Sequence, residues 1–266
     1  MDLLEKLKRD LSIEGRTSET INLYLNISQK FLSRYKEINE DNIKNFLFEL
    51  REEGFSDNYL RLTHYILRRL AKTDKKDINI SPPKIEKMNV KQPTFNYEEV
   101  KKLILNAKKV CNIQQKAILA VSTIWGLRKI EILRITKDDI NKKENTIVIK
   151  TAKGGRPQVY TIPQPVKEFI YNYEWEPLSR TKIYALFNYI LYICGFNLEN
   201  YHRYGFHSIR RALITEMLRA GIDHYTVALW CRWKIPEFGM LPVYHQVAKG
   251  DLEERVYPKH PFLKLW

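Results

Sequence analysis

A histidine and an arginine stand three residues apart in the segment HSIRRALITEMLRAG, at the expected start of a helix. His207 and Arg210 then lie on one side of the first turn, beside backbone N–H groups that favour an anion. An imidazole and a guanidinium together suit the oxygens of a phosphate group. Taken alone, however, this spacing is more often an ordinary solvated helix start, so the pair needs support from other segments.

A second arginine opens the apolar segment GLRKIEILRI. The apolar residues that follow Arg128 are expected to face the core, so its guanidinium is predicted to lie near the buried side and to need an anionic partner. Glu131 is the candidate for this partner. Two interpretations stay open. Either Glu131 neutralises Arg128 in a purely structural pair, or it holds Arg128 while the remaining N–H groups reach a phosphate.

A short hairpin is expected between the strands 146–150 and 159–163. Its connection, TAKGGRPQ, has two adjacent glycines that permit a tight turn, and it presents Lys153. A basic turn of this kind is usually solvated surface. It can also enter a DNA groove, where the lysine could deliver a proton to a leaving oxygen.

The charge of the chain points to a polyanionic partner. The formal net charge is +14 over 266 residues, and a balance of this size attracts nucleic acid above all. Of this excess, +11 falls in residues 93–266 and only +1 in residues 1–78. We therefore expect phosphate chemistry in the C-terminal part.

Several functional classes are disfavoured by the composition. No apolar run approaches the roughly 20 residues of a membrane helix, and the first residues lack the apolar stretch of a signal peptide. The three cysteines, Cys111, Cys194 and Cys231, have no CxxC spacing and are interpreted as reduced core thiols. No P-loop and no acidic metal cluster is present. We expect a cytoplasmic protein that has no membrane partner and uses neither cofactor nor metal.

Apolar periodicity divides the chain into two regions. Residues 1–76 are predicted to form a bundle of about four helices, which begin at caps such as Thr17 or Ser18 and Ser56. Residues 77–93 are charged, contain three prolines and are predicted to be a linker. Residues 94–266 are expected to form a second domain. The expected fold class is mainly α with a small antiparallel β-hairpin or sheet.

The motifs occur in a particular order: GLRKIEILRITKDDI, then the AKGGR hairpin, then HSIRRALITEMLRAGID, then a late tyrosine in VYHQV. In this order they resemble the tyrosine recombinase (phage integrase) family, and the resemblance covers nearly the whole chain. It implies a core DNA-binding domain over residues 1–76 and a catalytic domain over residues 94–266. Matched residue by residue, it also implies a catalytic set that consists of Arg128, Lys153, His207, Arg210, Trp233 and Tyr244.

The resemblance implies cleavage and rejoining of double-stranded DNA. Tyr244 would attack a phosphodiester and form a 3′-phosphotyrosyl link, which retains the bond energy for rejoining. Arg128 and Arg210 would stabilise the charge on the phosphate, His207 would assist proton movement, and Lys153 would protonate the leaving 5′-oxygen. In the family, four protomers assemble on DNA. A homo-tetramer on DNA is therefore expected, with a monomer or dimer when the protein is free.

One segment departs from the family pattern before the nucleophile. The family often has LGH where this chain reads LWCRW, so the position of the family's His or Trp has several candidates. They are Trp233, Trp230 and Arg232. Trp233 lies 26 residues after His207, close to the usual family interval, and its indole N–H would contribute packing and a hydrogen bond.

A second departure concerns the nucleophile itself. The stretch PEFGMLP lengthens the interval before Tyr244. Tyr257 therefore stays an alternative nucleophile, and Tyr225 a less favoured one. The sequence does not decide whether Tyr244 acts in its own protomer or in a neighbour's.

Two other functions remain open. A type IB topoisomerase shares the phosphotyrosine chemistry, but the compact interval between the HxxR motif and the tyrosine disfavours it. A catalytically inactive DNA-binding accessory protein is the alternative from another class, and the unusual LWCRW segment is its best support.

Overall fold

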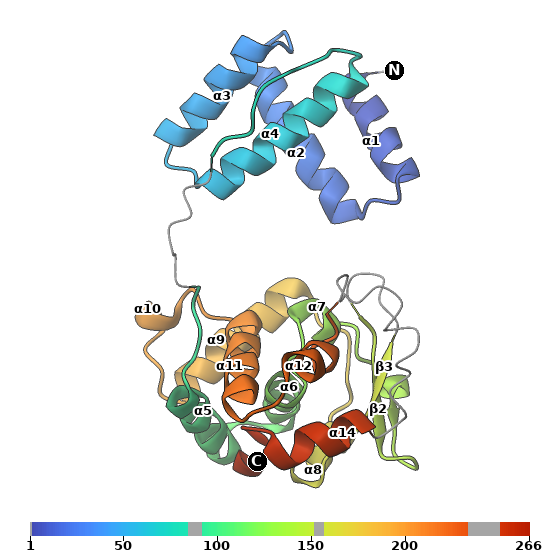
Figure 1. The fold of residues 1–266 in the computed structure, drawn as a ribbon, viewed down its shortest axis with the longest axis vertical. Coiled ribbons are helices and arrows are strands. Elements are labelled where there is room, and N and C mark those ends of the chain that lie inside the picture. Colours follow the sequence, from blue (N-terminus) through green and yellow to red (C-terminus); the bar gives the residue numbers. More distant parts are fainter. Residues whose placement is uncertain (1, 85–91, 152–156, 234–250) are drawn as a thin grey trace. The chain divides into compact units, whose positions relative to one another are not determined.

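The computed structural model describes residues 2–84, 92–151, 157–233 and 251–266. The chain divides into two compact units, Met1–Val90 and Lys91–Trp266, and each unit has its own cluster of buried apolar side chains (Figure 1). In the described part of the chain, no helix combines the length and the apolar character needed to cross a membrane. The predicted site residues Lys153 and Tyr244 lie outside the described residues.

The described part of the N-terminal unit is a bundle of helices, as the apolar periodicity predicts. These helices are α1 (Leu3–Ile13), α2 (Ser18–Arg34), α3 (Glu40–Glu52) and α4 (Asp57–Thr73). Thr17, Asn39 and Ser56 begin α2, α3 and α4, because each side chain accepts a hydrogen bond from a backbone N–H of the first turn. Each helix turns its apolar stripe inward, where Phe31 packs edge-on against Phe46.

The residues that follow α4 are held by the bundle. Ile78 is 7% exposed and belongs to the N-terminal core. The backbone N–H of Asn79 donates to the Glu40 carboxylate at 2.9 Å, and the ring Nε2 of buried His64 is hydrogen-bonded to the carbonyl of Ile80 at 2.9 Å. The first part of the predicted 77–93 linker therefore packs on the N-terminal unit.

The C-terminal unit is mainly helical in its described residues. Its α-helices are α5 (Tyr97–Val110), α6 (Ile113–Ile124), α7 (Lys129–Ile132), α8 (Gln164–Asn172), α9 (Arg180–Ile193), α10 (Leu198–Tyr201), α11 (Phe206–Arg219), α12 (His224–Trp230) and α14 (Asp251–Val256). Short 3₁₀ turns follow at η1 (Lys137–Asp139), η3 (Tyr257–Lys259) and η4 (Leu263–Leu265). Cys111, Cys194 and Cys231 are buried and form no disulfide, as predicted.

Helix α6 lies at the centre of this unit (Figure 1). Its apolar sequence AILAVSTI has no polar face, and residues 117–127 are buried throughout. Helices α5, α8 and α11 pack against it. A helix that is apolar on every side is stable only when neighbours cover it completely, so its C-terminal end is fixed deep inside the unit.

The sheet has three antiparallel strands in the order β1-β2-β3. They are β1 (Ile140–Asn141), β2 (Thr146–Ile149) and β3 (Gln158–Thr161), and Ile147 of β2 pairs with Tyr160 of β3. The predicted fold class, mainly α with a small antiparallel sheet, is confirmed. The sequence prediction missed β1, because two residues are too few to show an alternating pattern. It also placed the end of β3 two residues too late.

Candidate active site

The C-terminal end of α6 brings the candidate residues together. Three successive carbonyl oxygens, those of residues 124 to 126, accept hydrogen bonds from side chains of α11 and of the end of α12. The donors are Trp230 Nε1 to the first at 3.0 Å, Arg232 Nη2 to the second at 3.1 Å and Arg210 Nη1 to the third. The C-terminal end of a helix carries partial negative charge, so it favours these guanidinium groups.

Gly126 permits this junction. Its φ of +56° lies in the left-handed region, which a side chain strongly disfavours. A Cβ placed there would lie 3.0 Å from Leu213 Cδ2 and 3.5 Å from Arg210 Cγ. The glycine therefore ends α6, lets α11 approach closely and sets Arg128 two residues further along the chain.

Arg128 is anchored by Glu131, the partner that its sequence position predicts. Arg128 Nη1 donates to Glu131 Oε1 at 2.8 Å, and the backbone N–H of Arg128 donates to Oε2 at 2.8 Å. The Glu131 side chain is fully buried, whereas 22% of the Arg128 side chain is exposed. No other acceptor among the described residues contacts the Arg128 guanidinium, so the remaining N–H groups are available to an anion.

Glu131 holds a second arginine, which sequence reasoning did not identify as its partner. Arg232 Nη2 lies 3.1 Å from Glu131 Oε2, and its Nη1 donates to the hydroxyl of Tyr160 at 2.9 Å. Burial alone would raise the pKa of Glu131. The charge of Arg232 and the hydrogen bonds from both arginines outweigh this effect, so the pKa of Glu131 lies below its ordinary value.

The backbone at Arg232 shows how firmly this side chain is fixed. Its φ is +55°, a conformation usually left to glycine, and it ends α12 in a Schellman motif. In this motif the N–H of Arg232 donates to the Leu229 carbonyl and that of Trp233 donates to the Ala228 carbonyl, both at 2.9 Å. The buried contacts of the guanidinium help to stabilise a backbone conformation that residues other than glycine seldom adopt.

Arg210 is buried without a carboxylate partner among the described residues. It is 4% exposed, and its Nη1 and Nη2 donate to the carbonyl groups of Gly126 and Cys231. Burial lowers the pKa of Arg210 to about 10, and the nearby charges of Arg232 and Arg128 act in the same direction. The guanidinium thus stays charged at neutral pH. A buried cation whose partners are neutral carbonyls is well suited to receive an anion.

His207 lies one turn before Arg210 on α11, with its side chain exposed. Partial desolvation lowers the pKa of His207, and the positive charges of Arg210, Arg211 and Arg128 lower it further. The imidazole is therefore mostly neutral near pH 7 and can both donate and accept a hydrogen bond. The predicted trio of Arg128, His207 and Arg210 is brought together at one place.

The three candidates for the family's His or Trp position differ in burial. Trp230 is fully buried and packs edge-on against Tyr160, and its indole N–H donates to a carbonyl of α6. The Arg232 side chain is 2% exposed and forms an ion pair with Glu131. Trp233 is 45% exposed. Of these three, only Trp233 presents a free side chain to a ligand.

Tyr257, the alternative nucleophile, is a structural residue. Its hydroxyl donates to the Thr161 carbonyl and accepts from the indole N–H of Trp125 at 3.3 Å. Burial raises the pKa of Tyr257 well above its ordinary value, which disfavours the phenolate that a nucleophile needs. Another lysine of the hairpin, Lys150, forms an ion pair with Asp139 at 2.8 Å and so does not replace Lys153.

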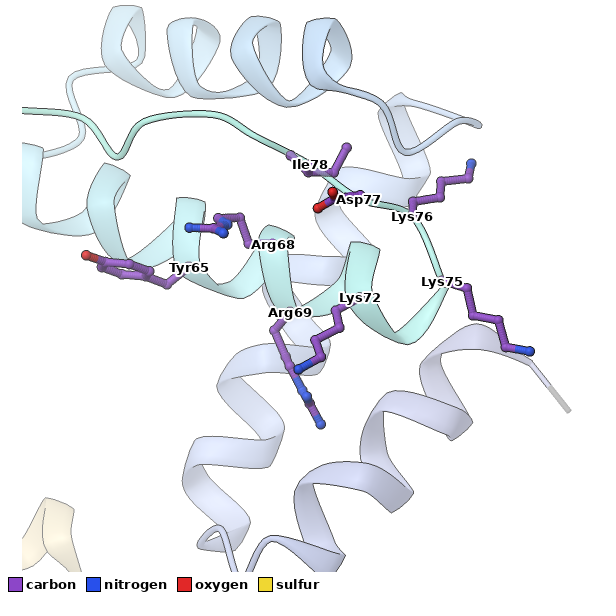
Figure 2. A pocket seen from close by; sticks show the side chains of 8 residues that line it. All are labelled: Tyr65, Arg68, Arg69, Lys72, Lys75, Lys76, Asp77 and Ile78. Atoms are coloured by element: carbon purple, nitrogen blue, oxygen red, sulfur yellow. The ribbon is translucent and has the colours of Figure 1, made fainter.

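The N-terminal unit carries a separate positive surface, which we name the α4 basic face (Figure 2). Its residues, from α4 and the turn after it, are Tyr65, Arg68, Lys72, Lys75 and Lys76. They border a hollow of about 510 Å³, and all five are exposed. Arg69 beside them is tied to Glu14 at 2.6 Å. Asp77 also lines the hollow, and Lys76 lies 3.5 Å from the carboxylate of Asp74. The charge count missed this face because acidic residues of the unit cancel its charge, although the spacing 65, 68 and 72 marks one side of a helix.

Known proteins resemble this chain over most of its length, although no family model matches it. The tyrosine recombinase XerA of Pyrococcus furiosus is 31% identical over 176 residues, which are 65% of this chain and 60% of that protein. The tyrosine recombinase XerA of Pyrococcus horikoshii is 27% identical over 244 residues, which are 84% of this chain and 81% of that protein. The chain thus spans about three fifths of the first relative's length. Both relatives are tyrosine recombinases, and this chain is similar to them over the shared residues.

Solved structures share the fold of this chain. A dimer of a lambda integrase segment bound to a COC′ core site superposes with a TM-score of 0.63 at 16% identity, and the match covers 89% of this chain and 95% of that one. The Tn1549 transposon integrase in complex with circular intermediate DNA gives 0.62 at 13% identity, and covers 96% of this chain and 98% of that one. At these identities the likeness is one of fold.

Proposed function

We propose that this protein is a tyrosine recombinase that cleaves and rejoins double-stranded DNA at a specific site through a 3′-phosphotyrosyl intermediate. The observation that carries the proposal is that two guanidinium groups are fixed near the end of α6: Arg210 donates to the Gly126 carbonyl, and Arg128, two residues further along the chain, is held by Glu131. Attack on a phosphodiester adds negative charge to the phosphorus oxygens in the transition state. Cations that are already fixed in place stabilise this charge more than they stabilise the bound DNA.

The proposed step balances as a simple exchange of oxygens on phosphorus. The phenolic oxygen of Tyr244 bonds to phosphorus, the bond to the 5′-oxygen breaks, and Lys153 supplies the proton that this oxygen takes. A free tyrosine has a pKa of about 10, and the field of Arg128 and Arg210 favours its phenolate. Attack by a 5′-hydroxyl on the phosphotyrosine reverses the step. The roles of Tyr244 and Lys153 rest on the family resemblance.

His207 and Trp233 complete the proposed site. The neutral imidazole of His207 can donate to a phosphate oxygen or take part in moving the nucleophile's proton. The exposed indole of Trp233 can pack against the phosphate and donate its N–H. Both roles use the chain's own side chains, and the proposed reaction needs no cofactor.

The two units would divide the work. Residues 1–76 would form the DNA-binding domain, with the α4 basic face on the phosphate backbone, and residues 94–266 would carry out catalysis. We expect a homo-tetramer on DNA, a monomer or dimer in free solution, and action in the cytoplasm. A lambda integrase tetramer bound to a Holliday junction shares the fold, with a TM-score of 0.62, which supports the proposed assembly.

A suicide substrate tests the proposal. A duplex from the DNA that flanks the gene, nicked next to each trial position, releases a short fragment on cleavage and traps the protein on the 3′-phosphate. We expect a covalent adduct, with the DNA attached to Tyr244 by peptide mapping. Tight binding without any adduct would favour the inactive accessory protein. Relaxation of a supercoiled plasmid by enzyme below one equivalent would favour a topoisomerase.

A further inference from the structure

A cavity of about 360 Å³ adjoins the candidate site in the C-terminal unit. It shares His207 with the site and lies next to the first turn of α11. Its lysine and arginine side chains come from three segments: Lys129 follows Arg128, Arg203 belongs to the loop before α11, and Arg211 follows Arg210. No part of the proposed reaction uses these three cations.

The cavity is positively charged and uncompensated. Among the residues that line it there is no aspartate or glutamate. Within the described part of the chain, neither Lys129 nor Arg203 forms an ion pair. Arg211 donates to two neutral acceptors, the Pro93 carbonyl at 2.9 Å and the Gln92 side-chain oxygen at 3.3 Å. These bonds fix the direction of its guanidinium and leave its charge unbalanced.

The apolar part of the cavity lining strengthens the electrostatic attraction of these cations for an anion. Phe187 and Phe206 line it, are almost fully buried and pack against each other with ring centroids 4.7 Å apart. Charges beside an apolar surface are screened less than charges in open solvent. Three cations that line one cavity with such an apolar part match a ligand with a compact negative charge and several acceptor oxygens, which describes a phosphodiester group.

We infer that this cavity binds the DNA phosphodiester next to the one that is cleaved, through Lys129, Arg203 and Arg211. This inference rests on the proposed function, because His207 belongs both to the cavity and to the proposed cleavage site. A second phosphate held in this way would fix the register of the strand. The scissile phosphorus would then lie between Arg128 and Arg210 rather than one nucleotide away.

Neutral phosphates in the DNA test the inference. Duplexes that carry a single methylphosphonate at each position around the cleavage point are compared for binding to the wild type and to the double variant Lys129→Gln, Arg203→Gln. Arg211 is kept, because it also holds residues 92–93. The matched control, Lys109→Gln with Arg255→Gln, removes two exposed charges from the same unit that do not line the cavity.

The expected result is one position beside the scissile phosphate at which the methylphosphonate weakens wild-type binding by about 10-fold, as loss of one charged contact predicts. At this position it should weaken the cavity variant by about 2-fold or less, because the contact is already lost. The salt dependence of the variant's affinity should also fall by one to two phosphate contacts. Equal penalties in both proteins at every position would overturn the inference.

Single substitution Arg203→Gln, in an exposed loop, repeats the test with the least disturbance of folding. Failure of the inference and failure of the proposed function give different results. If only the cavity assignment is wrong, the variant keeps wild-type interference while the adduct on Tyr244 still forms. If the proposed function is wrong, wild-type protein forms no adduct, and the interference pattern still reports whether the cavity holds a phosphate.

Discussion

The α4 basic face and the arginine cluster at the end of α6, which consists of Arg128, Arg210 and Arg232, are both positively charged. They differ in their exposure to solvent. Arg68 and Lys72 stand in solvent on one side of a helix. The side chains of Arg210 and Arg232 are almost completely buried, with guanidinium groups bonded to backbone carbonyls. Exposed charges are screened and mobile, and each adds a little to the attraction of DNA. Buried charges are fixed before the phosphate arrives, as stabilisation of a transition state requires.

The cluster also requires an internal counter-charge that the α4 basic face does not need. Glu131 accepts from Arg128 and Arg232 with its two oxygens, so one buried carboxylate positions two cations. Arg210 has no such partner among the described residues. The comparison predicts that changes at the cluster act on cleavage and folding, whereas changes on the α4 basic face act on affinity alone.

The largest expected effect follows removal of the proposed nucleophile. Tyr244→Phe deletes one oxygen and should abolish the covalent adduct on a suicide substrate, while DNA binding persists. The matched control is Tyr257→Phe, which removes a buried hydroxyl that bonds to the Thr161 carbonyl. It should lower the melting temperature and still form the adduct. Adduct formation by Tyr244→Phe, or its loss only in Tyr257→Phe, would reverse the assignment.

Arg210→Ala should separate cleavage from binding at the cluster. Loss of a single transition-state donor typically slows a reaction by about 10² to 10³, and loss of a charged donor by more. Affinity should change little, because this residue is one contact among many. Single-turnover cleavage and a binding titration are measured together, with the exposed Arg255→Ala as the control. Cleavage within about 3-fold of wild type would remove Arg210 from the site.

Glu131→Gln should act on folding and on cleavage together. It leaves Arg232 buried without its counter-charge, and breaking such a pair costs about 3–5 kcal/mol. All five tryptophans of the chain lie beyond residue 124, so their fluorescence during urea unfolding reports the C-terminal unit alone. The exposed Glu168→Gln serves as control. A free energy of unfolding within about 1 kcal/mol of wild type would mean that the arginines do not depend on this carboxylate.

Charge removal from the α4 basic face should change affinity only. Arg68→Gln with Lys72→Gln should reduce the slope of log affinity against log salt by about two phosphate contacts. Cleavage of DNA that is already bound should match wild type. Lys8→Gln with Lys36→Gln removes the same charge from exposed positions of the N-terminal unit outside this face. Equal losses in both double variants would mean that net charge, rather than this face, attracts the DNA.

The smallest expected effect concerns pH. Burial lowers the pKa of His260 in the C-terminal unit to about 4, whereas an unfolded histidine titrates near 6.5. Its contribution to stability is therefore complete above about pH 6.5 and is lost as the pH falls towards 4, about 2 kcal/mol of it between pH 7 and pH 5. His260→Gln should be less stable at pH 7 and show a flatter pH dependence over this window. An unchanged slope by tryptophan fluorescence would contradict the assignment.

The elements that depend on local signals could be predicted from the sequence. Helix starts at Thr17, Ser56 and Asn96 follow from cap residues, and the pairing of Arg128 with Glu131 follows from three-residue spacing and burial. The fold class followed from apolar periodicity, and the resemblance to tyrosine recombinases followed from motifs in a fixed order. Lys153 and Tyr244 stay predictions, because both lie outside the described residues.

The parts that could not be predicted depend on contacts between distant segments. Glu131 and Arg232 are separated by 101 residues, so no local pattern joins them. Arg232 showed only one signal, a charged residue in the otherwise apolar LWCRW, and this signal did not name its partner. The cavity beside His207 depends on the approach of residues 92–93 to α11, a contact over 118 residues. Charge counts also hide any face whose charge is cancelled elsewhere in the same unit.

Because Arg210 and Arg232 are bonded to the carbonyls that follow α6, the candidate site depends on the folding of the core. These carbonyls end the most deeply enclosed helix of the C-terminal unit, so that end cannot fray without releasing both guanidinium groups. Nor can either side chain swing away while the helix is intact. On heating, Arg210 and Arg232 should therefore keep their arrangement up to the temperature at which the whole unit unfolds. The arginine arrangement would then be lost in a single cooperative event. At no temperature below unfolding of the unit would the domain be folded with these arginines displaced.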